Sequence, residues 1–420
     1  MMSGLILGID LSDDYCQIAC FDPQVMDAEQ VSFAKDDENC LIPTVLCKRK
    51  KLDQWHIGEE AYSHALCGQG TVVDKLIRLA GKDGKATIEG VTYSAAQLLS
   101  HYVKRLIEIP IKKYNNPQIE RIVFTLQEEN IEVMDTLVKI GDSMGLPREA
   151  VHVATHAEAY LYYVISQQKE IWANQTCLFN LTERGLHYYE LRTLRGRTPN
   201  VVEVSHEMLE EGFSLDILDT ESGRKLADRI LLSCADRLLN RKLVSSVFLT
   251  GRGFEDTAWA NESLQYICNK RRVFAGQGLF CRGAAFLAYD YGLSQSAYPY
   301  IGICEGRLQS TVSMNVIHEG RSRQLIIAAA GTNWYGARAN IELIPDKTDV
   351  LELMVTALNG DRRVLRVELD ELPSRPNKMT RLEVVVSFSQ AGSMTVRVFD
   401  RGFGDFYPAT DKMIRKDFTL

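Results

Sequence analysis

The sequence has no Cys-x-x-Cys pair and no disulfide-type cysteine framework. Its ten cysteines are scattered along 420 residues. Cys16, Cys20 and Cys177 stand within apolar strand patterns, as small buried hydrophobic residues do. We therefore expect reduced, structural thiols.

Long apolar runs and a strong excess of one charge are also missing. No run approaches the roughly 20 apolar residues that span a bilayer, and no charged-then-apolar leader opens the chain. The net charge is only -7, and acidic and basic residues are interspersed. These features predict a cytoplasmic protein that binds neither membrane nor nucleic acid.

What is present is the composition of a soluble globular protein with several domains. Hydrophobic residues make up 45% and charged residues 25% of the chain, which is close to the globular average. A chain of this length exceeds one compact core, so two or three domains are expected.

Two β-hairpins open two similar patterns in the first 295 residues. The apolar run 5–11 breaks at Ser12-Asp13-Asp14 and resumes over 15–21, and a second pair of runs, 176–181 and 186–191, flanks the tip 182–185. Strands alternate with helices after each hairpin, which favours α/β lobes at 1–168 and 169–295. In the first lobe, helical spacing over 92–109 predicts a helix that Pro110 should end.

Beyond residue 295 the helical patterns almost disappear. Alternating strands with turn residues about every ten positions are typical of an all-β sandwich or barrel. We assign 296–420 to this β-domain.

Short segments along the chain carry a family resemblance through their order. They are 8–11, 42–45, 57–61, 122–125, 157–163, 249–253 and 282–285, followed by 382–388 and 391–400. In this order they resemble the actin-like ATPase superfamily, and most closely the seventy-kilodalton heat-shock chaperones. The resemblance implies a two-lobed α/β, actin-like (ribonuclease H-like) core followed by a β-sandwich substrate-binding domain. Compared with these chaperones, we expect no helical lid, a small insertion at about 42–92, and an adenine-clamping subdomain of the second lobe that is reduced or absent.

The resemblance also implies where a nucleotide cleft would lie. Its positions are Asp10, Ser12 and Asp13 in the first hairpin, Asn180, Thr182 and Gly185 in the second, and Gly251 and Gly253 at the adenosine turn. Phosphate hairpins use small residues so that backbone N–H groups can approach the phosphate oxygens.

The hairpin tips do not fit that chemistry. Asp13 and Asp14 would repel a polyphosphate, because two charges about 4 Å apart interact by about 4 kcal/mol at intermediate dielectric. In the second hairpin one glycine remains, while Glu183 and Arg184 would crowd the γ-phosphate. We therefore predict a degenerate ATP site without a cofactor.

Two metal sites remain as alternatives to ordinary turns and core positions. Asp10, Asp13 and Asp14 offer oxygen ligands for Mg²⁺ or Ca²⁺. The resemblance places His156 where a catalytic carboxylate is expected, and a neutral imidazole does not replace a carboxylate in orienting water. A shifted alignment gives that role to Glu158, and His152, His156 and Glu158 form a second metal hypothesis.

In the β-domain the chaperone resemblance implies an extended peptide in an apolar channel. Leu308, Val312 and Met314 are candidates to line it, although alternating apolar residues on a strand are commonly core residues.

Three functions follow from these observations. The favoured one is a chaperone-like, non-catalytic scaffold that binds a protein or peptide partner. The alternative is a divergent chaperone that still binds ATP and Mg²⁺ and hydrolyses ATP. A small-molecule or sugar kinase is the third, and the β-domain argues against it.

Overall fold

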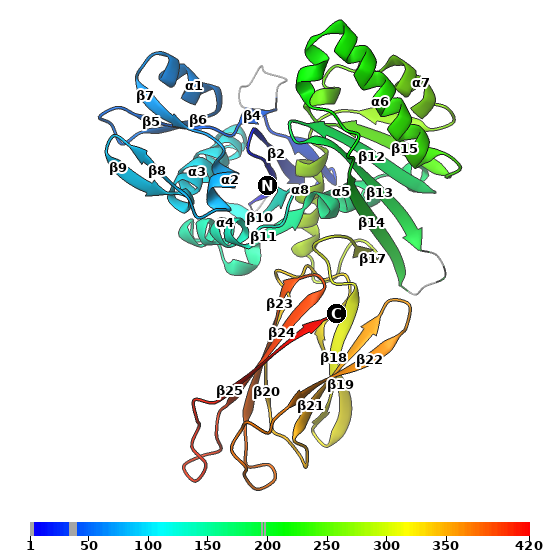
Figure 1. Ribbon diagram of the computed structural model, residues 1–420. Coiled ribbons are helices and arrows are strands. Elements are labelled where there is room, and N and C mark those ends of the chain that lie inside the picture. The colour runs from blue at the N-terminus through cyan, green and yellow to red at the C-terminus, as the bar shows by residue number, and fades with distance from the viewer. Residues whose placement is uncertain (1–3, 33–39, 195, 197–198) are drawn as a thin grey trace. The chain divides into compact units, whose positions relative to one another are not determined.

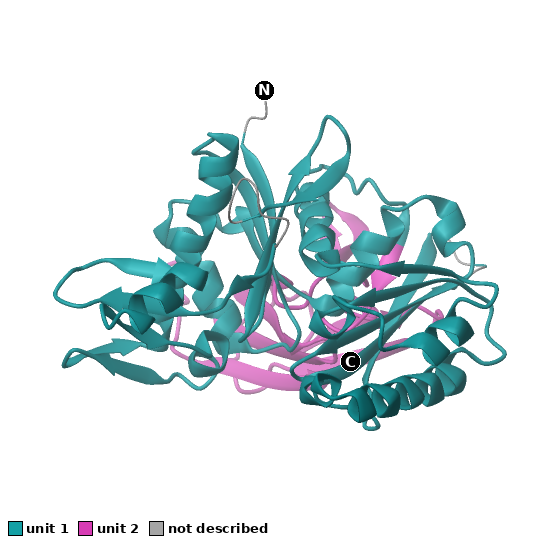
Figure 2. Ribbon diagram, turned by 90° about the horizontal axis from the view of Figure 1, so that it is seen from above, with its two compact units in different colours: residues 1–300 teal, residues 301–420 magenta. Residues whose placement is uncertain are grey.

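The computed structural model describes residues 4–32, 40–194, 196 and 199–420. The chain divides into two compact units, residues 1–300 and 301–420 (Figure 2). We describe each unit by itself. Among the described helices, none has the length and apolar character needed to cross a membrane.

The first sheet of unit 1 is built around the predicted N-terminal hairpin (Figure 1). Its strand order is β11-β10-β1-β2-β3. The strands are β1 (Leu5–Leu11), β2 (Tyr15–Asp22), β3 (Asp27–Gln30), β10 (Ile119–Leu126) and β11 (Val151–Thr155), and β4 (Ile42–Pro43) pairs with β2. β2 runs antiparallel to its neighbours β1 and β3, whereas β10 and β11 run parallel to β1.

The second sheet repeats this arrangement. Its order includes β16-β15-β12-β13-β14, with β12 (Gln175–Thr182), β13 (Gly185–Leu194), β14 (Asn200–Met208), β15 (Val244–Thr250) and β16 (Arg272–Ala275). β12, β13 and β14 are antiparallel, and β15 and β16 run parallel to β12. The predicted second hairpin is therefore confirmed, and both sheets share one order and one set of directions.

Two helices connect the sheets. α8 (Leu279–Tyr291) packs on β1, and α5 (His156–Ile165) packs on α8 and contacts β14 (Figure 1). The packing is close: a Cβ atom on Gly8 would lie 2.1 Å from the Cys281 carbonyl oxygen, and one on Gly283 would lie 1.9 Å from that of Ala159. Only glycine permits this approach of backbone to backbone.

The remaining helices and strands of unit 1 cover the sheets or form the region after β4. The helices are α3 (Ala95–Tyr114), α4 (Ile131–Ser143), α6 (Glu221–Leu239) and α7 (Asn261–Ile267). The region after β4 contains a small three-stranded sheet of β5 (Leu46–Arg49), β6 (Trp55–Ile57) and β7 (Gly70–Val73), which packs with α1 (Gly58–Leu66). It is followed by α2 (Leu76–Ala80) and by a hairpin of β8 (Lys85–Ile88) and β9 (Val91–Ser94). This small sheet was not predicted from the sequence.

The prediction that Pro110 ends its helix is wrong. α3 continues through Pro110 to Tyr114 and ends at Asn115, whose φ of 48° is left-handed. A proline inside a helix costs about 3 kcal/mol. Here Leu106, Ile107 and Pro110 are all buried, so packing of the apolar face offsets that cost.

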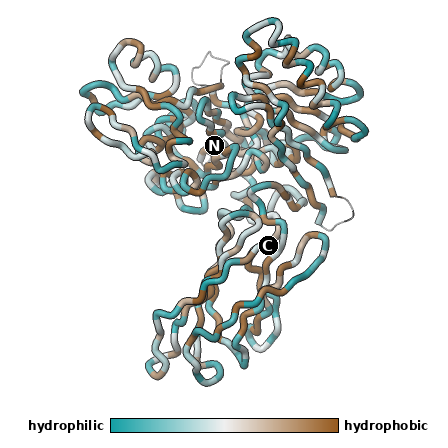
Figure 3. The backbone as a smooth tube through the Cα atoms, viewed as in Figure 1, coloured by the Kyte–Doolittle hydropathy of each residue, from teal (hydrophilic) through white to brown (hydrophobic). Residues whose placement is uncertain are grey.

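Unit 2 is an all-β region of antiparallel sheets, as predicted. Its sheets have the orders β19-β18-β21-β22 and β20-β23-β24-β25. The strands are β18 (Ser310–His318), β19 (Arg321–Ala328), β20 (Arg338–Leu343), β21 (Val350–Ala357), β22 (Arg362–Glu368), β23 (Leu382–Gln390), β24 (Ser393–Asp400) and β25 (Met413–Thr419), after β17 (Tyr300–Ile303) at the boundary of the units. Val312 and Leu353 of one sheet share a core with Val384 and Val396 of the other. Figure 3 shows hydrophobic stretches along many of the strands and hydrophilic residues in many outer loops.

Candidate functional site

A cavity of about 70 Å³ lies in unit 1 between residues of the two hairpins. Five of the predicted cleft positions line it, namely Asp10, Ser12, Asn180, Thr182 and Gly251. The other lining residues include Gln17, His156, Arg184, Arg252 and Phe280. The structure therefore brings most of the predicted positions together from distant parts of the sequence.

Asp13 joins the two hairpin tips. Its side chain is fully buried, and its Oδ2 accepts a hydrogen bond of 2.9 Å from Arg184 of the second tip. Its Oδ1 accepts a hydrogen bond of 2.9 Å from the backbone N–H of Arg78. The carboxylate thus has two protein donors and does not line the cavity.

A second ion pair crosses the same region. Arg252 donates to Glu183 at 2.8 Å, and its guanidinium lies 4.9 Å from the centre of the Tyr15 ring. Arg184 and Glu183, predicted to crowd a γ-phosphate, therefore each pair with a residue outside the second hairpin.

The three acidic residues of the first hairpin face different cationic or polar partners. Asp14 forms an ion pair with Lys75, Asp13 pairs with Arg184, and Asp10 accepts a hydrogen bond of 2.8 Å from His156 Nε2. They do not converge on one point, so this arrangement gives no support to the hypothesis of a shared Mg²⁺ or Ca²⁺.

His156 is held between an acid and an aromatic ring. Besides its contact with Asp10, its ring stacks on Phe280 with centres 3.9 Å apart and planes 10° apart. Glu158 instead caps α5 by accepting a hydrogen bond of 3.0 Å from the backbone N–H of Thr155. Within the described residues, these two and His152 do not form a metal-ligand group.

His152 lies apart from the cavity. Its Nε2 donates to the Glu149 carbonyl oxygen at 2.9 Å, and its ring stacks on Tyr291. Burial, together with Arg121 and Arg148, lowers the pKa of His152 to about 4, against the opposing effect of its hydrogen bond to Glu149. The imidazole is neutral at pH 7 and contributes to packing.

The cavity wall has polar atoms without partners in the described part of the chain. Asn180 Oδ1, Gln17 Nε2 and His156 Nδ1 are buried and make no hydrogen bond there. A volume of about 70 Å³ suits a few water molecules, each needing roughly 10–15 Å³ by this kind of measure. Sites for drug-sized ligands measure about 300–1,000 Å³, so the space does not suit a nucleoside triphosphate.

The three predicted cleft glycines have different local environments. Gly251 has φ of +91°, and a Cβ atom there would lie 2.4 Å from the Leu181 carbonyl oxygen. A Cβ atom on Gly253 would lie 2.2 Å from the Leu181 side chain. Gly185 has φ of +111° but open space around it. Close packing on Leu181 therefore explains the first two without a ligand, and backbone conformation explains the third.

The candidate peptide-binding residues lie in the interior of unit 2. Leu308 and Val312 are fully buried, and Met314 is 5% exposed. Val312 and Met314 belong to the core that both sheets share. The structure gives these side chains a packing role.

Sequence reasoning missed one group of potential ligands. His56, Glu60 and His64 place one ligand atom each within 4.8 Å of one another. Their spacing of four residues was visible in the sequence, but His56 precedes the helix that carries the other two, so helical periodicity alone did not reveal the group.

Comparisons with known proteins give families without an assigned function. A domain of unknown function, DUF8552, matches residues 307–420. None of the curated proteins matches the chain. The C-terminal model of a family of unknown function, DUF5716, matches residues 27–305, which is more than half of the sequence. The chain therefore belongs to the DUF5716 family.

Proposed function

We propose that unit 1 is an actin-like core that no longer binds nucleotide, and that the protein is a non-catalytic, chaperone-like scaffold for a protein partner. The observation that carries this proposal is the ion pair between the buried carboxylate of Asp13 and the guanidinium of Arg184. It joins the two hairpin tips at the place where an actin-like ATPase would need room for phosphates.

The repeated sheet supports the actin-like part of the proposal. Each sheet has three antiparallel strands followed by two strands parallel to the first. Two such sheets joined by α5 and α8 fit the two-lobed core that the chaperone resemblance implies. The positions of two segments that carry the resemblance support this reading, since residues 8–11 end β1 and residues 249–253 begin with the last two residues of the parallel strand β15.

Electrostatics supports the loss of nucleotide binding. A triphosphate in this region would have to separate Arg184 from Asp13, and would leave the fully buried carboxylate with only the guanidinium of Arg78, at 3.5 Å, beside the negative charge of the phosphates. Losing a hydrogen bond to a charged group costs about 1.5–3 kcal/mol. Binding would have to supply that free energy before any net affinity appeared.

The outer face of a sheet in unit 2 supports a protein partner. In one row across this sheet, Ser313 pairs with Ile326 and Met354, and Met354 pairs with Val364. Ile326 is 61% exposed and Val364 is 50% exposed. Between them Met354 is partly buried and Ser313 is fully buried, so Ile326 and Val364 are two separate exposed apolar residues on this face, and exposed apolar side chains are the contacts that a protein partner would cover.

Isothermal titration with ATP and Mg²⁺ tests the nucleotide part. We expect no saturable heat and no ATP hydrolysis. The alternative, a divergent ATP-dependent chaperone, draws on the shared cavity position of Asp10, Asn180 and Gly251. Micromolar binding with turnover would establish that alternative and overturn the proposal.

A peptide array probed with the full-length protein tests the partner part. We expect binding of extended apolar peptides that Ile326→Lys weakens at least several-fold. Leu226→Lys, at an exposed leucine of α6 in unit 1, is the matched control and should bind like the wild type. Equal binding by all three proteins would exclude this face as the peptide site.

A further inference from the structure

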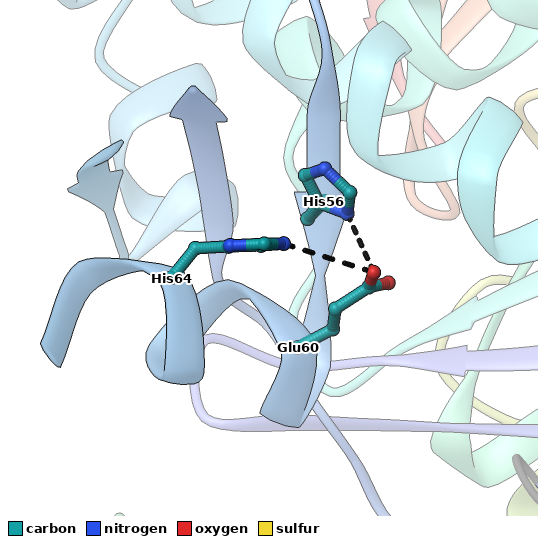
Figure 4. Close-up of side chains that lie close together, drawn as sticks. All are labelled: His56, Glu60 and His64. Carbon is teal, nitrogen blue, oxygen red and sulfur yellow. Dashed lines mark ion pairs between the residues drawn. The ribbon is translucent and has the colours of Figure 1, made fainter. Parts of the chain in front are cut away.

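His56, Glu60 and His64 come together from a strand and the helix that follows it (Figure 4). His56 lies on β6, whereas Glu60 and His64 lie one turn apart on α1. Residues four apart on a helix point the same way. In β6, Trp55 and Ile57 are each 5% exposed, so their side chains occupy one face of the strand and the side chain of His56 occupies the other.

The distances among these side chains are close to those around a metal ion. Glu60 Oε1 lies 2.8 Å from His56 Nδ1 and 3.8 Å from His64 Nε2. A tetrahedral zinc ion about 2.1 Å from each ligand holds the ligand atoms about 3.4 Å apart. The two distances lie on either side of this value, so small side-chain rotations would suffice.

Hydrogen bonding selects the correct tautomer of His64. Its Nδ1 lies 3.0 Å from the Gln69 side-chain oxygen, which can only accept, so Nδ1 carries the hydrogen. In the neutral ring Nε2 then presents a lone pair toward the Glu60 carboxylate. This lone pair and the carboxylate repel each other at 3.8 Å, and a divalent metal ion between them would be attracted to both.

Gln69 also provides His64 with the hydrogen-bond acceptor that metal-binding histidines normally have on the ring nitrogen that does not bind the metal. Such histidines usually donate their second ring N–H to an oxygen, which fixes the ring and raises its basicity. For His56, Nε2 has no hydrogen-bond partner among the described residues. Without a metal, Nδ1 lies 2.8 Å from Glu60 Oε1 and donates to it. Metal binding therefore requires this hydrogen to move to Nε2, which frees the Nδ1 lone pair for the ion.

The group is also accessible. The side chains of His56 and His64 are 19% and 21% exposed, and that of Glu60 is 53% exposed. His56 and Glu60 line a cavity of about 860 Å³. An ion can enter from this side, and the fourth coordination position remains available to water.

We propose that His56, Glu60 and His64 form a binding site for a divalent transition-metal ion of the Zn²⁺ type. Two imidazoles and one carboxylate suit zinc in a site with an open position, and also suit Fe²⁺ or Co²⁺. The site lies outside the hairpin cavity and does not depend on the fate of the nucleotide cleft.

The test is a Zn²⁺ titration of the metal-free, full-length protein against a competing chelator. Cys67 and Cys268 are exposed thiols, and thiolates are zinc ligands, so both are replaced by serine in every sample to remove this competing binding. We expect one bound ion per chain. Removing an outer-shell partner costs about 10–100-fold in metal affinity, so Gln69→Ala should weaken binding about tenfold, and His64→Ala should weaken it further.

Glu59→Gln is the matched control, because Glu59 is an exposed neighbour on α1 outside the group. It should bind Zn²⁺ like the parent protein. Co²⁺ provides a second readout, since its d–d absorption reports nitrogen and oxygen ligands and should be lost in His64→Ala. If His64→Ala fails to fold, the exposed Glu60→Gln carries the test.

The proposal is overturned if the parent protein binds no ion. It is also overturned if His64→Ala and Glu60→Gln bind as tightly as the parent. In that case the three side chains form only a hydrogen-bonded surface cluster.

Discussion

The carboxylate of Asp13 accepts a hydrogen bond of 2.9 Å from the guanidinium of Arg184, although the two residues lie 171 positions apart in the sequence. Each residue stands at the tip of a hairpin, and each hairpin opens one of the two repeated sheets. The side chain of Asp13 is fully buried, whereas that of Arg184 is 28% exposed. The pair therefore links the two sheets through a charge that has no access to water.

Arg184→Ala should destabilise unit 1 by about 1.5–3 kcal/mol, because it removes a charged hydrogen bond to the buried Asp13 carboxylate and leaves only the guanidinium of Arg78, 3.5 Å from Asp13 Oδ2, as a counter-charge. Denaturation in urea measures the loss. Arg192→Ala is the control: Arg192 and Glu203 form an exposed pair at 2.6 Å, and such pairs contribute about 0–1 kcal/mol. Equal losses in the two variants would show that the tip contact adds no more than a surface ion pair.

Gly251→Ala should cost more stability than Gly185→Ala, although both glycines have positive φ. A left-handed or related conformation costs a non-glycine residue about 1–3 kcal/mol. At Gly251 the new Cβ would also lie 2.4 Å from the Leu181 carbonyl oxygen and 2.5 Å from Asn180 Oδ1, whereas at Gly185 nothing lies within 4 Å. Overpacking adds about 1–3 kcal/mol. Thermal unfolding compares the two variants, and similar melting temperatures would contradict the steric explanation.

The sequence allowed the hairpins and most strands to be predicted, because their apolar patterns are local. β15 was predicted at 244–250 and is Val244–Thr250. β25 was missed, since within Met413–Thr419 only Ile414 is buried, and a strand at the edge of a sheet needs few apolar residues. The end of α3 was misplaced because burial of Pro110 depends on tertiary packing that helix-ending rules do not include.

In the hairpin cavity, too, local sequence features could be predicted, whereas contacts made by tertiary folding could not. The cleft positions Asp10, Asn180 and Gly251, which the family resemblance implied, line one cavity, whereas Asp13, Gly185 and Gly253 do not. The partners of the tip residues were not predictable, because Asp13 meets Arg78 and Arg184 only after the chain has folded. Acidic residues at a hairpin tip indicate repulsion of phosphate, but the sequence does not indicate which basic residue forms an ion pair with each of them.

Protonation of Asp400 should lower the free energy of unfolding of unit 2 at acidic pH. Arg375 donates two hydrogen bonds of 2.7 Å to its carboxylate, and Gly402 N–H and Thr410 also donate to it. Burial acts to raise the pKa of Asp400, but these donors outweigh it and hold the pKa below its ordinary value. The stabilisation is therefore fully present above the pKa of an unfolded aspartate, about 3.9, and is lost as pH falls through the lower folded value.

Hydrogen exchange of residues 393–400 at several pH values, corrected for intrinsic rates, measures this effect. We expect protection to fall below about pH 4 in the wild type. Asp400→Asn should be less stable at neutral pH by about 3–5 kcal/mol, because it leaves Arg375 without its charge partner, and its stability should change less between pH 5 and 3. An unchanged acid response in this variant would place the effect in another carboxylate.

Protonation of His152 should make the free energy of unfolding of unit 1 depend on pH, separately from the effect of Asp400 in unit 2. Burial lowers its pKa to about 4, whereas an unfolded histidine has a pKa of about 6.5. Between these values the unfolded chain binds more protons than the folded one, so the contribution of His152 is complete above about pH 6.5 and declines until about pH 4. His187, whose pKa is also lowered to about 4 by burial and by His206, should add to the same slope.

Urea denaturation of unit 1 between pH 7 and 4 measures this slope. His152→Gln should reduce it, because glutamine does not titrate and can still donate to the Glu149 carbonyl oxygen that His152 contacts. His318→Gln is the control, since His318 is exposed on β18 of unit 2; it should leave the slope unchanged. If His152→Gln kept the full pH dependence of the unfolding free energy, His152 would not be its cause. His187→Gln would then test whether His187 binds the extra protons in the unfolded chain.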